Sequence, residues 1–207
     1  MLFSLLLATA GAWEPIAEVD GVQVYRRDTP GSPFHAMRGS GIVDAPARLV
    51  AQVLLDDVRA HEWVDSLAEA RVVRVIAADE YIEYNHVSMP PLVHDRDFIT
   101  DVRMGVDAAA KMILIESQPS DEPWPDNGHI RGRLRGSYEI QSLGDGKKCR
   151  LTVELHADPK GALPAWLVNF FQKDSVRETI LAIRKQVKRA DLTPPPEFDE
   201  FLKSIVF

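Results

Sequence analysis

Polar and apolar residues alternate along most of the chain, a period typical of β-strands with one buried face. The alternation predicts strands over residues 22–25, 34–43, 71–76, 80–88, 97–104, 112–116, 130–141 and 150–156. Gly144-Asp145-Gly146 favours a tight hairpin turn between the last two strands. No helix-length pattern separates the strands after residue 71, so we expect them to form an antiparallel sheet.

Helical patterns are fewer. A first helix is predicted after Asp44, which can cap free backbone N–H groups, with Pro46 in its first turn. From residue 13 we expect a short helix or coil that leads to a turn at Asp20-Gly21, and over residues 61–64 a short helical piece. The longest helix is predicted over residues 164–190, because apolar residues recur there at spacings of three and four.

The two faces of the predicted strands differ in character. In the strand over residues 97–104, the even-numbered positions are mostly apolar and the odd-numbered ones are mostly charged. A sheet with one apolar face must cover that face, and the long helix over residues 164–190 can do so. We therefore predict an α+β fold in which a curved antiparallel sheet wraps around a long C-terminal helix. Three prolines, residues 194–196, end that helix before a short amphipathic tail over residues 198–207.

Glycines occur in pairs on two predicted strands, Gly39 with Gly41 and Gly132 with Gly136. They remove side-chain volume from the sheet face that should be buried. The pairs are compatible with a ligand cavity, with a helix packed close to the sheet, or with sheet twist in a solid core.

Composition argues against several kinds of partner and site. The 207 residues contain 24 Lys+Arg and 31 Asp+Glu, a net charge of −7, which argues against nucleic-acid binding because phosphate contacts need a basic surface. The single cysteine, Cys149, excludes an internal disulfide and a cysteine-built zinc site. The six histidines are scattered without metal-ligand spacing, so we predict neither a metal nor a cofactor. No apolar run reaches the roughly 20 residues of a membrane-spanning helix.

The first twelve residues carry no charge and resemble the apolar part of a secretory signal, with a small-residue exit at Ala8-Thr9-Ala10. A positively charged leading segment is missing, and an apolar N-terminal helix kept in the mature fold is the alternative. We expect a signal-like segment over residues 1–12, one domain over residues 13–190, and a proline-rich linker with the tail over residues 191–207. The expected location is periplasmic or secreted, and otherwise cytoplasmic.

Several motifs resemble the START domain family, the lipid-transfer domains related to the steroidogenic acute regulatory protein, and its bacterial members in particular. The most specific are Asp95-Arg-Asp-Phe98 and the stretch from Asp158-Pro to Pro164-Ala-Trp-Leu-Val-Asn169. The resemblance implies a helix-grip fold and a lipid carried in a hydrophobic tunnel, which is gated by residues 89–95 and the C-terminal helix. Where the family has Trp-Pro, this chain has Pro90-Pro-Leu-Val93, which changes the wall of the entrance loop.

Polar groups on the apolar faces are the candidate ligand anchors. Arg96 shares its face with Phe98 by alternation, and a buried cation needs a partner, either an inward carboxylate or a polar group of the ligand. His86 and Tyr84 share one face of their strand and can offer hydrogen bonds, as can Tyr138. A structural role in the core is the alternative for each. The predicted apolar wall of the tunnel comprises Phe98, Val102, Leu134, Val153, Leu163, Leu167 and Phe170.

We predict a binding protein for a hydrophobic lipid rather than an enzyme, with two alternatives. The first is a cofactor-free aromatic polyketide cyclase or dehydratase that uses Arg96, His86 and Tyr138 as acid–base groups. The second is an adaptor that docks through residues 198–207. Residues 160–190 carry seven positive and two negative side chains, which allows transient contact with an anionic membrane or reflects only a solvated face.

Overall fold

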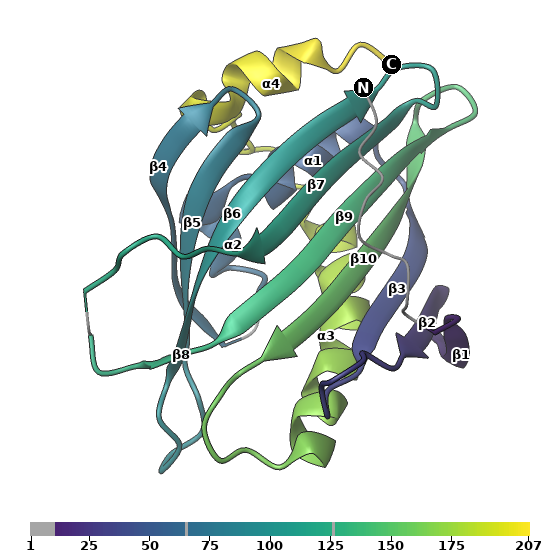
Figure 1. Cartoon of the computed structure of the whole chain (residues 1–207). Helices are drawn as coiled ribbons and strands as arrows, with labels where there is room; N and C mark the ends of the chain where they lie inside the picture. Colours follow the sequence, from purple (N-terminus) through teal and green to yellow (C-terminus); the bar gives the residue numbers. More distant parts are fainter. Residues whose placement is uncertain (1–10, 65, 126) are drawn as a thin grey trace.

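The computed structural model describes residues 11–64, 66–125 and 127–207, so most of the expected signal-like segment lies outside the described residues. Figure 1 shows a curved sheet with a long helix behind it. The strands are β1 (Glu14–Val19), β2 (Val22–Arg27), β3 (Ala36–Val43), β4 (Leu67–Ala77), β5 (Glu80–Val87), β6 (Arg96–Asp107), β7 (Met112–Pro119), β8 (Ile130–Arg131), β9 (Arg133–Leu143) and β10 (Lys148–Asp158). The helices are α1 (Ala47–Leu54), α2 (Asp57–Ala60), α3 (Ala165–Gln186), the 3-10 turn η1 (Pro196–Phe198) and α4 (Asp199–Ser204).

All strands belong to one sheet, in the order β1-β2-β3-β10-β9-β7-β6-β5-β4, with β8 paired to β6. Neighbours along this order are antiparallel, as predicted, and the short β8 pair is parallel. Helix α3 packs across β2, β3 and β10. The α+β fold with a curved sheet around a long C-terminal helix is therefore confirmed. Within the described ranges, no helix is long and apolar enough to cross a membrane.

The start of the chain differs from the prediction. Residues 14–19 form strand β1 rather than a helix or coil. Asp20 and Gly21 both have positive φ, at 55° and 67°, and this tight turn pairs Val19 with Val22 on β2. The neighbouring strand supplies the hydrogen bonds that define β1, and local periodicity carries no signal of that partner. The predicted helical piece over residues 61–64 is a turn that directly follows α2.

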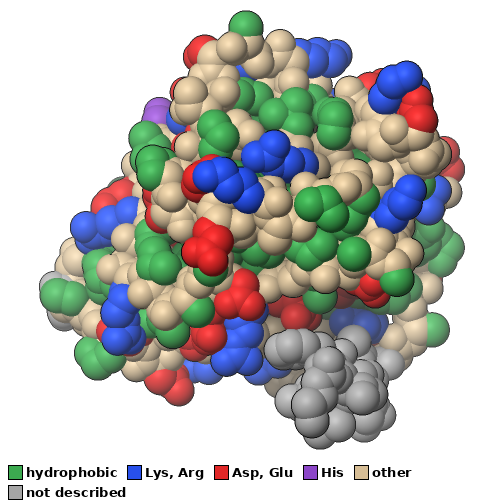
Figure 2. Space-filling view, turned by 90° about the horizontal axis from the view of Figure 1, so that it is seen from above, with side chains coloured by type: hydrophobic (Ala, Val, Ile, Leu, Met, Phe, Trp, Pro, Cys, Tyr) green, Lys and Arg blue, Asp and Glu red, His purple; other side chains and the backbone are tan. Residues whose placement is uncertain are grey.

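The C-terminal tail belongs to the same core as the sheet. Phe198 is 1% exposed, and its ring centroid lies 4.7 Å from that of Tyr81 on β5. The backbone carbonyl of Leu202 accepts a hydrogen bond from Arg48 Nε at 2.9 Å. The predicted adaptor that docks through this tail is therefore not supported, because the tail buries Phe198, Phe201, Leu202 and Ile205 in its own domain and leaves Val206 exposed. Figure 2 views this end of the molecule, where apolar side chains lie among charged ones of both signs.

All four paired glycines allow close packing. A Cβ atom on Gly39 would lie 2.9 Å from the Val176 carbonyl oxygen of α3, and one on Gly41 would lie 3.1 Å from the side chain of Ile180. A Cβ on Gly132 would lie 2.3 Å from the ring of Phe98, and one on Gly136 would lie 3.1 Å from the Glu154 carbonyl oxygen. The prediction of a helix packed close to β3 is confirmed, and these glycines do not mark empty space.

Candidate functional site

The inner face of the sheet is fully buried at the end near the C-terminal tail and partly exposed at the end near the start of α3. Toward the tail, inner-facing side chains such as Val102, Ile140 and Leu151 are at most 1% exposed. Toward the start of α3, other side chains that the strand register places on the same inner face keep part of their surface exposed. These are Glu83, Asn85, Ser117, Leu134, Tyr138 and Leu155.

Arg96 connects the start of β6 to the segment that leads into α3. It is 3% exposed, and its guanidinium donates to the carbonyl oxygens of Pro159 at 3.3 Å, Lys160 at 3.4 Å and His94. Its predicted inner-face position agrees with the register, which places it opposite Val87. The ion pairs within the described ranges include none to Arg96, so backbone carbonyls take the place of the predicted inward carboxylate.

Two carboxyl groups missed by the sequence analysis reach the interior. Asp57 on α2 is 9% exposed, and its Oδ2 has no hydrogen-bond partner among the described residues. Glu83 on β5 accepts a hydrogen bond from the Thr100 hydroxyl at 3.4 Å. Burial, followed by the nearby charge of Glu83, raises the pKa of Asp57 to about 8, and burial also raises the pKa of Glu83. Asp57 is therefore largely protonated at neutral pH and can donate a hydrogen bond.

Two tyrosines complete what we call the interior polar cluster, which consists of Asp57, Glu83, Tyr81 and Tyr138. Tyr138 lies opposite Val153, so its predicted inward orientation is confirmed. Burial, followed by the charges of Glu83 and Asp57, raises the pKa of both tyrosines. Both phenols thus remain protonated and able to donate hydrogen bonds.

The structure corrects the predicted roles of Tyr84 and His86. Both side chains lie on the outer face of the sheet, since they pair with Ile99 and Asp97 rather than with inner-facing residues. The Tyr84 ring stacks on Trp124 with centroids 4.8 Å apart. Because the segment that contains Trp124 covers this outer face, β5 has apolar residues on both faces, and alternation alone cannot tell which face is inside.

The predicted apolar wall is only partly formed as expected. Val102 and Val153 lie in the close-packed core, and Phe98 covers Gly132. Phe170 is 56% exposed and lies off the buried stripe of α3, so its predicted place in the wall is wrong. The three leucines predicted for this role are partly buried, namely Leu134, Leu163 and Leu167.

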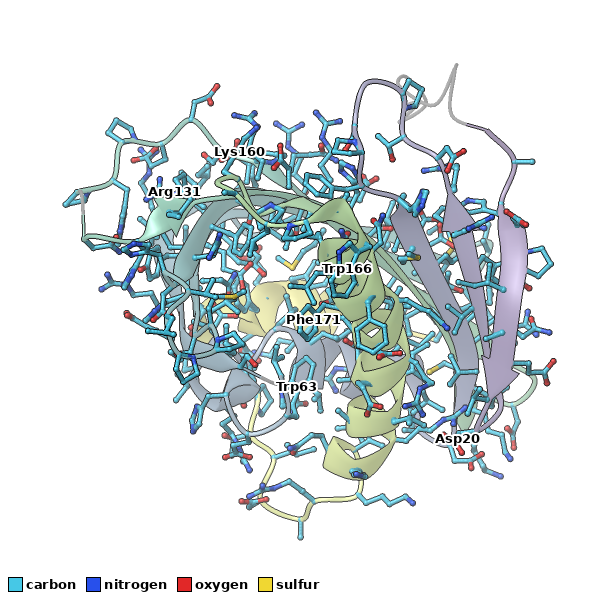
Figure 3. The ribbon with its side chains drawn as sticks, turned by 90° about the horizontal axis from the view of Figure 1, so that it is seen from below. Asp20, Trp63, Arg131, Lys160, Trp166 and Phe171 are labelled. Carbon is cyan, nitrogen blue, oxygen red and sulfur yellow. The ribbon has the colours of Figure 1, made fainter. Side chains whose placement is uncertain are left out.

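The first turns of α3 display an aromatic patch, defined as Trp166, Phe170 and Phe171. These side chains are 72%, 56% and 50% exposed, and the two phenylalanine rings pack edge to face at 5.9 Å. Figure 3 views the molecule from this end and labels Trp166 and Phe171 on α3. The loop between β5 and β6, which carries the fully exposed Leu92, projects at the same end in Figure 1. Apolar surface is thus exposed beside the partly exposed end of the inner face.

Several basic side chains of α3 already have partners within the protein. Arg177 forms an ion pair with Asp20 at 2.7 Å. Arg184 donates hydrogen bonds to backbone carbonyls, including that of Ile42 at 2.8 Å. The positive charge counted in the sequence is therefore not all available to an external anion.

Two hollows open on the surface formed by the described residues. One, of about 170 Å³, lies on the outer face of the sheet and is lined in part by Arg133, Arg135 and His156. The other, of about 220 Å³, lies where β1 and β2 meet α3, beside Val19 and Arg177. Neither lies beside residues 89–95, so neither corresponds to the predicted tunnel.

Comparison with known proteins identifies the family. The START domain family matches residues 1–192. An uncharacterised protein of Pseudomonas aeruginosa is 28% identical over 185 residues, which cover 88% of this chain and 90% of that protein. Phosphatidylcholine transfer protein of Bos taurus is 27% identical over 173 residues, 81% of this chain and 80% of that protein. The chain belongs to the START domain family, as the motif resemblance predicted.

Solved structures agree on the fold. The STAR-related lipid transfer protein of Xanthomonas axonopodis superposes with a TM-score of 0.76 at 24% identity, over 86% of this chain and 99% of that one. Human StAR-related lipid transfer protein 5 gives a TM-score of 0.77 at 22% identity, over 85% of this chain and 86% of that one. The predicted helix-grip architecture is therefore that of known START-fold proteins.

The residues named for the cyclase alternative do not come together. Arg96 and Tyr138 lie on the inner face of the sheet, whereas His86 lies on the outer face. A single acid–base site cannot use groups on opposite faces of one sheet, because catalytic groups must reach one reacting centre. The cyclase in its predicted form is therefore not supported by this arrangement.

Proposed function

We propose that this protein binds a lipid between the curved sheet and α3 and transfers it between membranes. The observation that carries the proposal is the partly exposed inner face of the sheet near the start of α3, where side chains such as Leu134 and Leu155 are not fully covered. Covering such apolar surface with a hydrocarbon chain gains about 25 cal/mol per Å². The similarity to a protein named for phosphatidylcholine transfer supports the same ligand class.

The interior polar cluster favours a lipid with a hydrogen-bonding head group. An unpartnered buried oxygen such as Asp57 Oδ2 is costly, and a purely hydrocarbon ligand would leave it unpartnered. A protonated Asp57 and the phenol of Tyr138 can donate to a hydroxyl, ester or phosphate oxygen. The ligand class we propose is therefore an amphiphile whose head enters the protein and whose chain occupies the apolar part.

The proposed entrance lies between residues 89–95 and the start of α3. Arg96 spans this region, since it follows the loop directly and bonds the carbonyls of Pro159 and Lys160. Opening the entrance by moving either side requires these hydrogen bonds to break. Arg96 thus holds the entrance closed in the resting protein.

The aromatic patch and Leu92 are the proposed membrane contact. Tryptophan and phenylalanine partition well into the lipid–water interface, and both lie beside the proposed entrance. Because Arg177 and Arg184 already have partners, we expect this contact to depend more on apolar insertion than on anionic lipid. Replacing Trp166 and Phe170 by alanine should reduce vesicle binding at every lipid composition.

Native mass spectrometry of the full-length protein tests the ligand directly. We expect a fraction of the molecules to carry a co-purified lipid, which solvent extraction identifies, and to exchange it with added vesicles. A protein that emerges empty and takes up no lipid from vesicles would contradict the proposal.

A filling substitution tests whether the interior is hollow. Ser117 faces the interior between Val102 and Gly136, whereas the neighbouring Gln118 faces outward. In a hollow interior, Ser117→Phe should fold with little change in stability but lose lipid binding. In a solid interior the same change should cost about 1–3 kcal/mol. Gln118→Phe is the matched control and should retain lipid in either case.

A further inference from the structure

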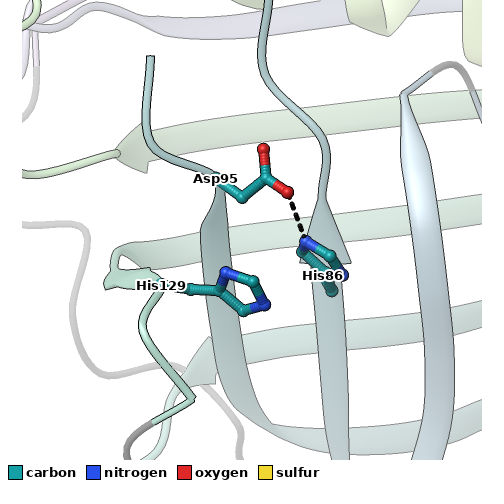
Figure 4. Close-up of side chains that lie close together, drawn as sticks. All are labelled: His86, Asp95 and His129. Atoms are coloured by element: carbon teal, nitrogen blue, oxygen red, sulfur yellow. Dashed lines mark hydrogen bonds and ion pairs between the residues drawn. The ribbon is translucent and has the colours of Figure 1, made fainter. Parts of the chain in front are cut away.

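Two imidazoles and a carboxylate meet on the outer face of the sheet (Figure 4). His86 Nε2 lies 2.8 Å from Asp95 Oδ2. The rings of His86 and His129 stack with centroids 4.0 Å apart and planes 18° apart. One ligand atom from each of the three residues lies within 4.8 Å of the others, and all three side chains are partly buried. The residues are 43 positions apart at most, which is why no metal-binding spacing is visible in the sequence.

The backbone fixes the three residues at adjoining strand ends. His86 lies near the end of β5, Asp95 directly before β6 and His129 directly before β8. The Ile130 N–H donates to the Asp95 carbonyl at 2.9 Å, which places His129 beside Asp95. The second oxygen of the Asp95 carboxylate accepts a hydrogen bond from the Met89 N–H at 2.8 Å. The carboxylate is thus oriented toward the two rings before any ion arrives.

Imidazole nitrogen and carboxylate oxygen are the ligands that Zn²⁺ and similar divalent transition ions take in proteins, at about 2.0–2.2 Å. Two ligands of one tetrahedral ion lie about 3.4 Å apart, so small side-chain rotations would bring the three atoms into range. Partial exposure leaves room for water as a fourth ligand. A hydrogen bond accepted by the second oxygen of a ligating carboxylate, here from the Met89 N–H, is also the kind of outer contact that holds metal ligands in place.

We propose that His86, Asp95 and His129 bind a divalent transition-metal ion, with Zn²⁺ as the best match to the donor set. His86 and Asp95 flank residues 87–94, the loop that carries Leu92, and the ion would join the two ends of that loop and attach them to residue 129. Metal binding should therefore reduce the motion of the loop. The metal site does not depend on the proposed function. An effect of this loop on lipid entry does rest on the proposed function.

Calorimetric titration with ZnCl₂ tests the site. The full chain is used, prepared without a polyhistidine tag. We expect one ion per chain, and CoCl₂ should give the visible absorption of a low-coordinate cobalt site. His129→Ala should weaken binding at least tenfold, because His129 supplies one of three ligands, and among the described residues its ring makes no hydrogen bond. His94→Ala is the matched control, since His94 is an exposed histidine of the same loop outside the cluster, and it should bind Zn²⁺ like the unaltered protein.

Several results would overturn the site. These are no saturable Zn²⁺ binding, equal binding by His129→Ala, or an equal loss in His94→Ala, which would indicate diffuse binding by surface histidines. Hydrogen exchange gives a second readout, in which saturating Zn²⁺ should slow exchange in residues 88–95 of the unaltered protein and not in His129→Ala. Unchanged exchange in both would contradict the proposed ordering of the loop by the ion. None of these measurements uses lipid. A negative result would therefore overturn the metal site without bearing on the proposed lipid binding.

Discussion

Gly39 of β3 and Val176 of α3 meet backbone to backbone. A Cβ atom at Gly39 would lie 2.9 Å from the Val176 carbonyl oxygen and 3.2 Å from the Val176 Cβ. Through this close approach the middle of α3 packs directly against the sheet, and Val176 itself is fully buried. The glycine therefore sets how near the long helix can come to the sheet, and with it the width of the space beside the helix.

Gly39→Ala should destabilise the protein, because the added methyl group must push α3 away from β3. We expect a loss of about 1–3 kcal/mol in the free energy of unfolding, measured by urea denaturation. Gly105→Ala is the control, since a Cβ at Gly105 meets no atom within 4 Å, and it should change stability by no more than about 0.5 kcal/mol. Equal effects of the two substitutions would show that the contact does not limit packing.

Arg96→Met should loosen the segment before α3. The substitution keeps an apolar side chain of similar length but leaves the carbonyls of Pro159 and Lys160 without their donor, at a cost of about 1.5–3 kcal/mol. Hydrogen exchange in residues 159–163 should become faster, and lipid exchange should accelerate. Arg103→Met, which removes only an exposed pair with Glu80, should cost about 0–1 kcal/mol and leave exchange in that segment unchanged.

Asp57 should make stability fall as pH rises. Its folded pKa of about 8 lies above its ordinary value of 3.8, so between these values the folded protein holds a proton that the unfolded chain has released. The free energy of unfolding then decreases across this window, by at most about 1.4 kcal/mol per pH unit for one group, and levels off above it.

Asp57→Asn should remove that part of the pH dependence, because the amide does not titrate. Urea denaturation across the window should give a flatter profile than for the unaltered protein, with the variant gaining most at the alkaline end. Asp101→Asn, on the outer face of β6, should keep the original profile. Parallel profiles for the unaltered protein and Asp57→Asn would contradict the assignment.

Cys149 should be inert in the folded protein. It is fully buried in the core, and burial raises the pKa of its thiol to about 12, so almost no reactive thiolate exists at neutral pH. A thiol reagent such as Ellman's should label it only as fast as the protein unfolds, and fully in urea. Ser88→Cys in a Cys149→Ala background places a thiol at an exposed position and should react at once. Rapid labelling of Cys149 in the native protein would show that this part of the core opens readily.

The sequence predicts the architecture well because its strongest signals are local. Alternation marks the strand that contains Phe98 and Val102, the glycine turn marks the β9–β10 hairpin, and the spacing of Val176 and Ile180 marks α3. Each of these features depends on residues close together in the chain. The motif at Asp95–Phe98 then indicates the START domain family.

The features that escaped prediction depend on residues far apart in the chain. The inward face of β5 is decided by residue 124, whose segment covers the other face, so alternation alone does not reveal Glu83 and predicts Tyr84 on the inside. Asp57 acquires its unusual environment only when α2 meets the sheet. His86 and His129 meet because β8 pairs with β6, and no spacing rule anticipates a two-residue parallel strand.

Burial of Phe198, Leu202 and Ile205 in the core has a consequence for how the protein is made. These residues lie beyond residue 192, where the family match ends, yet they fill the end of the core beside Tyr81. The growing chain cannot complete that core until residues 198–205 have left the ribosome. A product shortened near residue 192 would therefore present unfilled apolar surface to chaperones and proteases.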